Sequence, residues 1–322
     1  MKKINNALLI TFTIFSCMVR AQDINPASPD TSWKRGGFIS ISFNQVSLTN
    51  WAAGGQNSLS GTFIGKFYAN YEKGKASWDN NIDLAYGFLE SGAARAQKNL
   101  DRIELNTKYG HQATENLYYS SLINVKTQFA PGYNYPNDSV KISHFAAPAY
   151  VTASLGMDYK LGTYFTLFLS PATGRLVIVE DQRLADAGQF GVDPATYDSQ
   201  GNKLSNGKML RTEFGAYLRA RFQRNIVKSI GLMSELALFN NYTDPKVYQR
   251  GNVNVDWQVM LTVKSGKFLT FSVFTQLLYD NNISIPTYGN VIVGNTIQNE
   301  IISSGPKTQF QEAVGVGLSY KF

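Results

Sequence analysis

The sequence predicts an all-β fold, namely an antiparallel transmembrane outer-membrane β-barrel of about 12 strands. From Gly37 onward, apolar and polar residues alternate with a period of two, which is typical of strands with two different faces. The alternating runs are roughly 10 to 14 residues long, which suits strands that cross a bilayer at a tilt. Short connections alternate with long ones, as expected for short periplasmic turns and long extracellular loops.

Residues 1–21 have the pattern of a secretory signal peptide that is removed from the mature chain. Two lysines provide a positive start, Ala7 to Phe15 form an apolar core, and the small residue Ala21 ends the segment. The apolar core is too short to span a bilayer, which takes about 20 residues. The alternative processing event is cleavage before Cys17, followed by lipidation of that cysteine.

The signal also bounds the charge and the chemistry of the mature chain. Residues 1–21 carry three basic residues and no acidic one, so their removal lowers the formal net charge from +7 to +4. This mild excess, in an exported protein, argues against a nucleic-acid partner. Cys17 is the single cysteine, so cleavage after Ala21 leaves no disulfide and no thiolate chemistry. We expect residues 22–35 to form a periplasmic N-terminal segment and residues 36–322 to form a single transmembrane β-barrel domain.

Twelve alternating runs follow one another along the chain, an even number as expected for an antiparallel barrel. The alternation is clear at 76–88, where Ile82 and Leu84 share one face and Asp79 and Asp83 share the other. The predicted strands are 37–47, 58–71, 76–88, 99–111, 117–130, 148–159, 163–180, 211–223, 229–241, 251–264, 268–283 and 309–322.

Two of these strands contain irregularities. In the first strand, Ile39 and Phe43 share one face, whereas Val46 continues the apolar set on the opposite parity. This change predicts a β-bulge at residues 44–45, which re-aims the barrel rim. The strand 163–180 is interrupted by the letters "SPATGR", and it either ends there or continues as a ribbon above the membrane.

The stretch "NWAAGGQNS", Asn50 to Ser58, joins the first two strands on the long-loop side. Gly54 and Gly55 provide the positive φ angles that a tight reversal needs. A phosphate-binding loop would require a helix after the glycines, and a strand is expected instead. We therefore interpret this stretch as a shaped hairpin, in which Trp51 packs against the rim or into the lumen and is a candidate for contact with a partner.

The end of the chain, "GVGLSYKF", resembles a C-terminal membrane-insertion signal. Gly317, Tyr320 and Phe322 carry the resemblance, so we expect the barrel-insertion machinery to recognise the last strand. Aromatic residues also gather at the short-turn ends of the predicted strands, as in the aromatic girdle of a membrane barrel. The girdle candidates are Tyr71, Trp78, Tyr109, Tyr119, Tyr159, Tyr164, Phe222 and Tyr320.

The polar face of the strands predicts a charged lumen. Acids and bases on this face balance, eight against eight, which argues against an ion-selective pore and favours a narrow or filled barrel. The main members of this lumen charge network are Lys66, Asp79, Asp83, Arg102, Glu104, Lys108, Lys126, Glu213, Arg219, Arg221 and Asp256. The remaining members are Asp158, Glu235, Asp280, Lys264 and Lys321.

The residues offer little catalytic or metal chemistry. Lipid-modifying barrel enzymes need a histidine near the outer rim, and His111 is expected at the opposite end. His144 lies in an outer loop, where Ser143 or Asp138 could assist it as an acid–base site, but a polar loop histidine is the favoured interpretation. The acidic segment within 181–210 lacks the spacing of a calcium loop. We therefore predict no catalytic residue, no metal site and no cofactor.

Several motifs, taken in order along the chain, resemble a Bacteroidetes-type family of outer-membrane β-barrel proteins of unknown function. The motifs are "NWAAGGQNS" (50–58), "SWDNNIDLAYG" (77–87), "KTQFAPGY" (126–133), "ISHFAAPAY" (142–150), "LSPATGR" (169–175), "LFNNY" (238–242) and "NVDWQV" (254–259). The resemblance implies a barrel in the outer membrane, and it implies no substrate and no catalytic residue.

These observations predict a non-enzymatic barrel that is a structural or interaction component of the outer membrane. A place beside assembly or export machinery is one setting for such a role. Its contacts would be outer-membrane lipid and other outer-membrane proteins, the latter through loops 131–147 and 181–210. The alternative is a narrow channel for a small solute. A more remote alternative is a lipid-modifying enzyme that uses His144.

Overall fold

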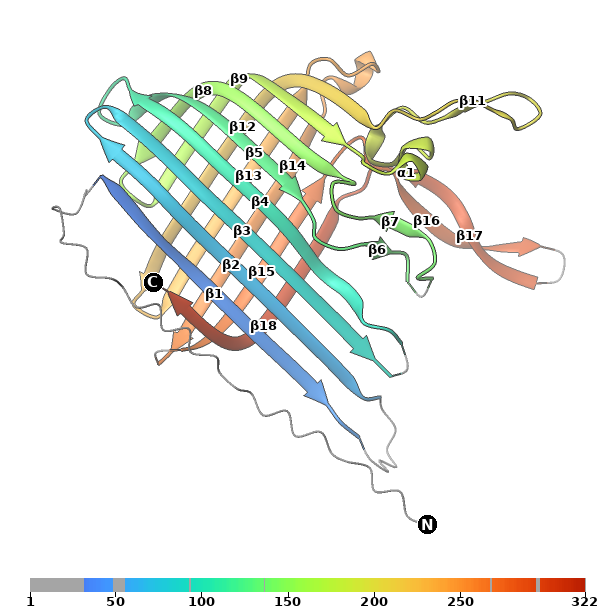
Figure 1. The fold of residues 1–322 in the computed structure, drawn as a ribbon, viewed down its shortest axis with the longest axis horizontal. Coiled ribbons are helices and arrows are strands. Elements are labelled where there is room, and N and C mark those ends of the chain that lie inside the picture. Colours follow the sequence, from blue (N-terminus) through green and yellow to red (C-terminus); the bar gives the residue numbers. More distant parts are fainter. Residues whose placement is uncertain are drawn as a thin grey trace, which may run out of the picture. The chain divides into compact units, whose positions relative to one another are not determined.

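The computed structural model describes residues 32–48, 56–92, 94–135, 137–266, 268–293 and 296–321. Twelve antiparallel strands close into a barrel, as predicted. Each strand pairs with its neighbour in the chain, and the first and last strands close the ring (Figure 1). The barrel strands are β1 (Trp33–Val46), β2 (Ser58–Lys73), β3 (Ala76–Ser91), β4 (Gln97–Gln112), β5 (Leu117–Thr127), β8 (Ala149–Leu161), β9 (Phe165–Ile178), β12 (Leu210–Val227), β13 (Ile230–Asn241), β14 (Val253–Ser265), β15 (Leu269–Tyr279) and β18 (Gln309–Lys321).

The remaining elements gather at one end of the barrel, which we call the long-loop end (Figure 1). Tight connections join the strands at the other end, which we call the short-turn end. No helix among the described residues is long and apolar enough to cross a membrane. The elements of the long-loop end are β6 (Gly132–Tyr133), β7 (Lys141–Ser143), α1 (Gln182–Asp186), η1 (Gln189–Gly191), β10 (Thr196–Tyr197), β11 (Lys203–Ser205), η2 (Val247–Gln249), β16 (Ile285–Val293) and β17 (Thr296–Gly305).

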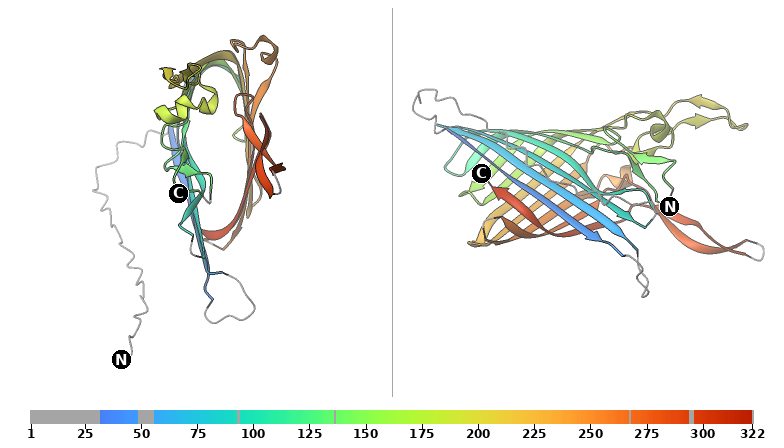
Figure 2. Two further views of the ribbon diagram at one scale, coloured as in Figure 1. Left: turned by 90° about the vertical axis from the view of Figure 1, so that its right-hand side faces the viewer. Right: turned by 60° about the horizontal axis from the view of Figure 1, so that its bottom comes forward.

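The side chains of the wall have the reverse arrangement of a water-soluble protein. Large apolar residues are exposed on the outside, and Phe43 and Leu318 keep 65% and 67% of their surface. Polar residues are buried inside, and Glu104 and Asp158 keep 2% and 0%. The wall is a flattened ring when it is viewed end-on (Figure 2). An outward apolar face around a polar interior is the arrangement that a barrel surrounded by lipid requires.

The aromatic residues of the short-turn end include a cluster that starts the barrel. Trp33 packs against Tyr71 and Trp78, with ring centroids 5.2 and 6.0 Å apart. The strand β1 begins at Trp33, within this cluster, rather than at the expected residue 36 or 37.

The strand β9 is continuous through "SPATGR", which corrects the expectation of an interruption or a separate ribbon. Its ladders with both neighbours shift register by one residue around Pro171, so the segment contains a β-bulge. Proline is tolerated there because a bulge leaves a backbone N–H without a ladder partner. The neighbouring strand β8 carries Gly156 opposite the bulge, since a Cβ there would lie 2.1 Å from the backbone oxygen of Leu169 in β9.

The bulge predicted at residues 44–45 is absent. β1 pairs with β2 in unbroken register from Trp33 to Val46. On its other side, β1 pairs with the described residues of β18 only from Phe38 to Ile41. The long-loop end of β18 turns away instead, and Gln311 of β18 donates a hydrogen bond to a β4 backbone oxygen, 3.0 Å away. Val46 therefore lies exposed where β1 has no paired neighbour on this side. Its apolar side chain needs no bulge to explain it.

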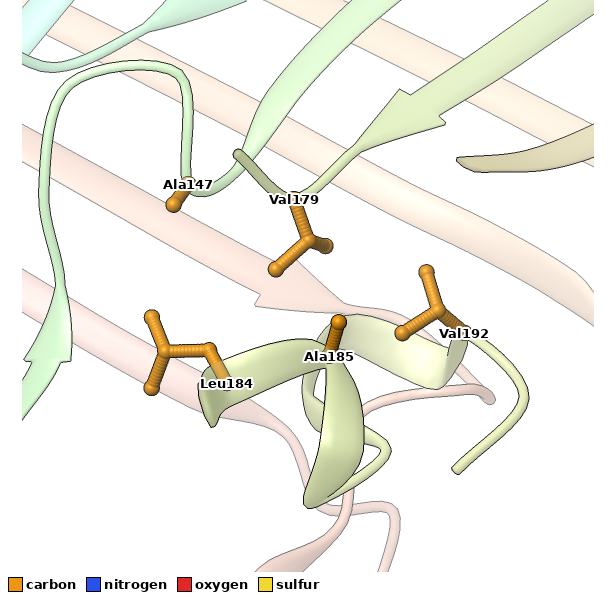
Figure 3. Packing of buried hydrophobic residues seen from close by; sticks show 5 residues of the cluster. All are labelled: Ala147, Val179, Leu184, Ala185 and Val192. Atoms are coloured by element: carbon orange, nitrogen blue, oxygen red, sulfur yellow. The ribbon is translucent and has the colours of Figure 1, made fainter. Parts of the chain in front are cut away.

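A small apolar core holds the segments of the long-loop end together. Ala147 before β8, Val179 after β9 and Leu184 of α1 are buried against one another (Figure 3). Ala185 and Val192 complete the cluster, and the partly buried Phe190 packs against it. We call residues 179–209 the cap, because this segment packs on the connection before β8 at the long-loop end.

Some predicted features lie outside the described residues. They are the signal peptide 1–21, most of the segment 22–35, the hairpin residues Trp51, Gly54 and Gly55, and the terminal Phe322 of the insertion signal. Gly317 and Tyr320 of the same signal lie in β18.

Candidate functional site

Side chains from opposite walls meet across the middle of the lumen. Nζ of Lys126 on β5 lies 2.7 Å from Oδ2 of Asp256 on β14 and 3.6 Å from Oε1 of Glu104 on β4. Arg102 on β4 donates to Oε1 of Gln258 on β14, 2.6 Å away. Five strands separate β4 from β14 in either direction around the ring, so this hydrogen bond crosses the full lumen.

A second polar group extends this central layer. Arg219 on β12 lies 2.7 Å from Glu235, and its guanidinium also donates to Oδ1 of Asn106 on β4, 2.5 Å away. The amide of Asn124 donates to Glu104 and to Asn106. Lys126, Glu104, Arg219 and Glu235 therefore each lie within 4 Å of an opposite charge, as buried ions require. Arg102 is held instead by its hydrogen bond to Gln258.

Apolar side chains fill the spaces beside these ion pairs. Leu122, Phe168, Tyr217 and Phe239 form one buried lumen cluster. A second cluster is built from Ile64, Met233, Met260 and Phe274. The guanidinium of Arg102 lies 5.0 Å from the centroid of the Phe274 ring, which joins the polar layer to the second cluster.

Arg175 organises the long-loop end of the lumen. Its guanidinium contacts Glu213 and lies 3.4 Å from Asp280, and it stacks 4.5 Å from the Phe239 ring. Arg211 lies 3.1 Å from the same Glu213. A small cavity of about 120 Å³ lies between this group and the central layer.

The short-turn end of the lumen is wider and more basic. Lys108 lies 2.7 Å from Asp158, and Lys160 lies 2.8 Å from Asp79. Lys66 lies 3.5 Å from Asp83. Beneath the central layer, all of these residues except Asp158 line a cavity of about 1,020 Å³, which we call the vestibule.

The structure brings the eleven main members of the proposed charge network into the lumen, as ion pairs or as hydrogen-bonded groups. Three lumen cations were missing from the sequence prediction, namely Lys160, Arg175 and Arg211. Arg175 was missed because the bulge in β9 inverts the parity after Pro171. Lys160 and Arg211 lie at strand ends, where the boundaries were uncertain. With these three, the lumen has more bases than acids, so its charges do not balance as expected.

The two histidines occupy different surroundings. His111 is exposed at the short-turn end. Nε2 of His144 lies 3.2 Å from Oδ2 of Asp181 in the cap, whereas Asp138 pairs with Arg95. Asp138 is therefore not the acid beside this histidine.

Carboxylates organise the cap. Asp181 accepts a hydrogen bond from the backbone N–H of Leu184 and so caps α1. Burial alone would raise the pKa of Asp181, but this hydrogen bond and the contact with His144 outweigh burial and lower it. The side-chain hydrogen bond from Lys203, followed by those from the backbone N–H of Gly207 and from Gln182, lowers the pKa of Asp186 to about 2.

Within the part of the chain that the structure describes, no three histidine, cysteine, aspartate or glutamate residues converge on a position that could hold a metal ion.

The chain is similar to one protein family over part of its length and to several solved structures. A family described as "Protein of unknown function (DUF3078)" matches residues 43–133. No curated protein matches the chain. The translocator domain of the autotransporter NalP from Neisseria meningitidis is similar over 92% of this chain and 90% of its own, with 9% identity and a TM-score of 0.36. The COG4313 outer membrane channel from Pseudomonas putida F1 is similar over 93% and 100%, with 14% identity and a TM-score of 0.37.

Proposed function

We propose that this protein is an integral outer-membrane β-barrel that acts as a structural and interaction component of that membrane rather than as an open pore or an enzyme. The outward apolar face supports insertion in lipid, because water-soluble monomers rarely expose apolar patches of such extent. The observation that carries the non-conducting role is the central layer, in which Arg102 meets Gln258 across the full width of the lumen.

The exposed tips of the long-loop end support the interaction role. Val247 and Tyr248 of η2 keep 69% and 79% of their surface, and Leu204 of β11 keeps 68%. Apolar and aromatic side chains at exposed tips are typical of contact residues in protein interfaces. We expect another outer-membrane protein to bind this end, including the segment 181–210.

A narrow channel is the second candidate, and one specific observation favours it. The vestibule and the small cavity lie on opposite sides of the same central layer, and Asn106 and Asn124 of that layer line one cavity each. A displacement of this single layer would join the two spaces.

Planar-bilayer recording of the purified, folded protein separates the two candidates. We expect silence from the natural chain and conductance from the variant Arg102→Ala/Phe274→Ala, which removes a crossing side chain and its stacking partner. The matched control is Ile103→Ala/Val273→Ala, which changes the outward positions next to them and should stay silent. Stable, solute-sensitive steps from the natural chain would overturn the structural role.

The interaction role has its own test. Co-purification from outer membranes should identify a fixed partner that is lost from the variant Leu204→Asp/Tyr248→Asp.

The enzyme alternative is tested at His144. If this histidine were catalytic, His144→Ala would change the lipid composition of the membrane. We expect the composition to stay the same.

A further inference from the structure

The vestibule is a cavity that the proposed structural role does not use. Its volume of about 1,020 Å³ is at the upper end of the range for small-molecule sites. Residues of the tight connections line it, among them Asn116, Thr163 and Ser229, so the vestibule reaches the short-turn rim. Its inner end is the central layer, where Arg219 and Phe168 form part of the lining.

The lining of the vestibule is predominantly basic. Two buried acids behind the lining, Asp158 and Glu235, are already paired with lining cations. The cations of the lining therefore outnumber all nearby acids. The lining cations are Lys34, Lys66, Lys108, Lys160, Arg219, Arg221, Arg224, Lys228 and Lys264, and the lining acids are Glu72, Asp79, Asp83 and Glu115.

Two of the inward-facing cations lack a carboxylate of their own. Arg221 lies 3.7 Å from Glu235, an acid that Arg219 already holds at 2.7 Å. Lys264 forms no ion pair with any described residue, although its strand position pairs with the buried Thr270 on the lumen side. These two cations lie on one wall of the vestibule, which β12, β13 and β14 form.

A fixed positive excess inside a low-dielectric wall attracts anions and concentrates them. The guanidinium of Arg221 donates one hydrogen bond to the neutral Oε1 of Gln223, 3.0 Å away, and keeps further N–H donors that match phosphate and carboxylate oxygens. The ammonium group of Lys264 adds a point charge nearer the rim. Tyr68 and Tyr118 add aromatic surface to the same lining, and this surface can pack against the uncharged part of an organic ligand. We propose that the vestibule is a binding site for a small solute with two or more phosphate or carboxylate groups, which enters from the short-turn end. This inference goes beyond the structural role and does not depend on whether the lumen conducts.

Isothermal titration calorimetry of the folded full chain in detergent tests the site, with inorganic pyrophosphate and citrate as probes and spermidine as a control of opposite charge. We expect saturable binding of at least one anion, binding that weakens as salt rises, and no binding of spermidine. The variant Arg221→Gln/Lys264→Gln should bind at least about tenfold more weakly, since it removes two charged hydrogen-bond donors from the lining.

Matched variants keep the result interpretable. Lys141→Gln/Lys208→Gln removes the same net charge at the long-loop end and should bind like the natural chain. Arg221→Lys/Lys264→Arg keeps both charges and should retain most of the affinity. If the double glutamine variant does not fold, Lys264→Gln alone gives the same test near the rim. Absence of binding by both anions, or binding that Lys264→Gln and the double variant leave unchanged, overturns the proposal.

Discussion

Nζ of Lys126 lies 2.7 Å from Oδ2 of Asp256, although at least four strands separate β5 from β14 along the sheet in either direction. The two side chains are only 24% and 15% accessible. The amide of Gln276 also donates to Asp256, so the carboxylate has partners from two strands. This pair therefore ties opposite walls of the barrel together through its centre.

Removal of one partner from this pair should destabilise the barrel strongly. Asp256→Ala leaves the Lys126 ammonium largely buried with Glu104 as its remaining carboxylate, and the loss of a partner from a buried pair costs about 3–5 kcal/mol. Urea unfolding in detergent, followed by tryptophan fluorescence, measures the change. The double variant Lys126→Met/Asp256→Leu should lose less stability than Asp256→Ala, because it leaves no unpaired charge. An equal or greater loss in the double variant would contradict this account.

The strands β12 and β13 approach each other closely at Gly215. A Cβ at this position would lie 1.8 Å from the backbone oxygen of Asn240, which no rotamer change can relieve. We expect Gly215→Ala to reduce the fraction of folded barrel sharply, as measured by heat-modifiable migration on gels. Gly174 is the matched control, because a Cβ there meets nothing within 4 Å. Similar folded fractions for the two alanine variants would show that β12 and β13 are not crowded at Gly215.

The seam between β1 and β18 can be tested with a disulfide. The Cβ of Ser42 lies 4.0 Å from the position that a Cβ would take on Gly315, which is within the range for disulfide-bonded residues. We expect Ser42→Cys/Gly315→Cys, in a Cys17-free mature chain, to form an intramolecular disulfide on mild oxidation. The pair Asn44→Cys/Ala313→Cys, one step farther toward the long-loop end, should not form it, because the ladder ends at Ile41. Mass spectrometry of peptides distinguishes the results, and efficient bridging by both pairs would mean that the seam is closed.

The cap should loosen only in strong acid. The pKa of Asp186 is about 2 in the folded cap, below the ordinary value of about 3.9 in an unfolded chain. A carboxylate with a lowered folded pKa stabilises above its unfolded pKa, and this contribution is lost as pH falls through its folded pKa. Cleavage of residues 179–209 by pepsin should therefore increase between about pH 4 and pH 2.

Two variants test the assignment of this acid response to Asp186. Asp186→Asn should make the cap cleavable already at pH 4, because an amide cannot replace the carboxylate toward both Lys203 and Gln182. Glu115→Gln, at the opposite end of the barrel, should cleave like the natural chain. An unchanged pH profile in Asp186→Asn would remove Asp186 as the cause.

The strand pattern was predictable because each wall residue has only two possible environments. The alternation of Ile82 with Asp83 specifies which face meets the exterior and which meets the lumen, and it needs no knowledge of distant residues. The same reasoning failed after Pro171 in β9. There, one extra residue inverted the parity, so that Arg175 entered the lumen unpredicted. Reasoning from alternation also predicted a bulge near Val46 that is absent. Val46 lies beyond the paired part of the β1–β18 seam, so its side chain is not sorted between lipid and lumen.

The sequence by itself determined the barrel class, the twelve strands and the separation of apolar and polar faces, because these follow from a period of two along each strand. Only the tertiary structure decided which charges meet, as Lys126 meets Asp256. It also decided that the central layer crosses the lumen and that a basic vestibule lies beneath it. The physical reason is that pairing across a lumen depends on ring closure, bulges and side-chain reach. These join residues more than 100 positions apart in the chain, for example Arg102 and Gln258.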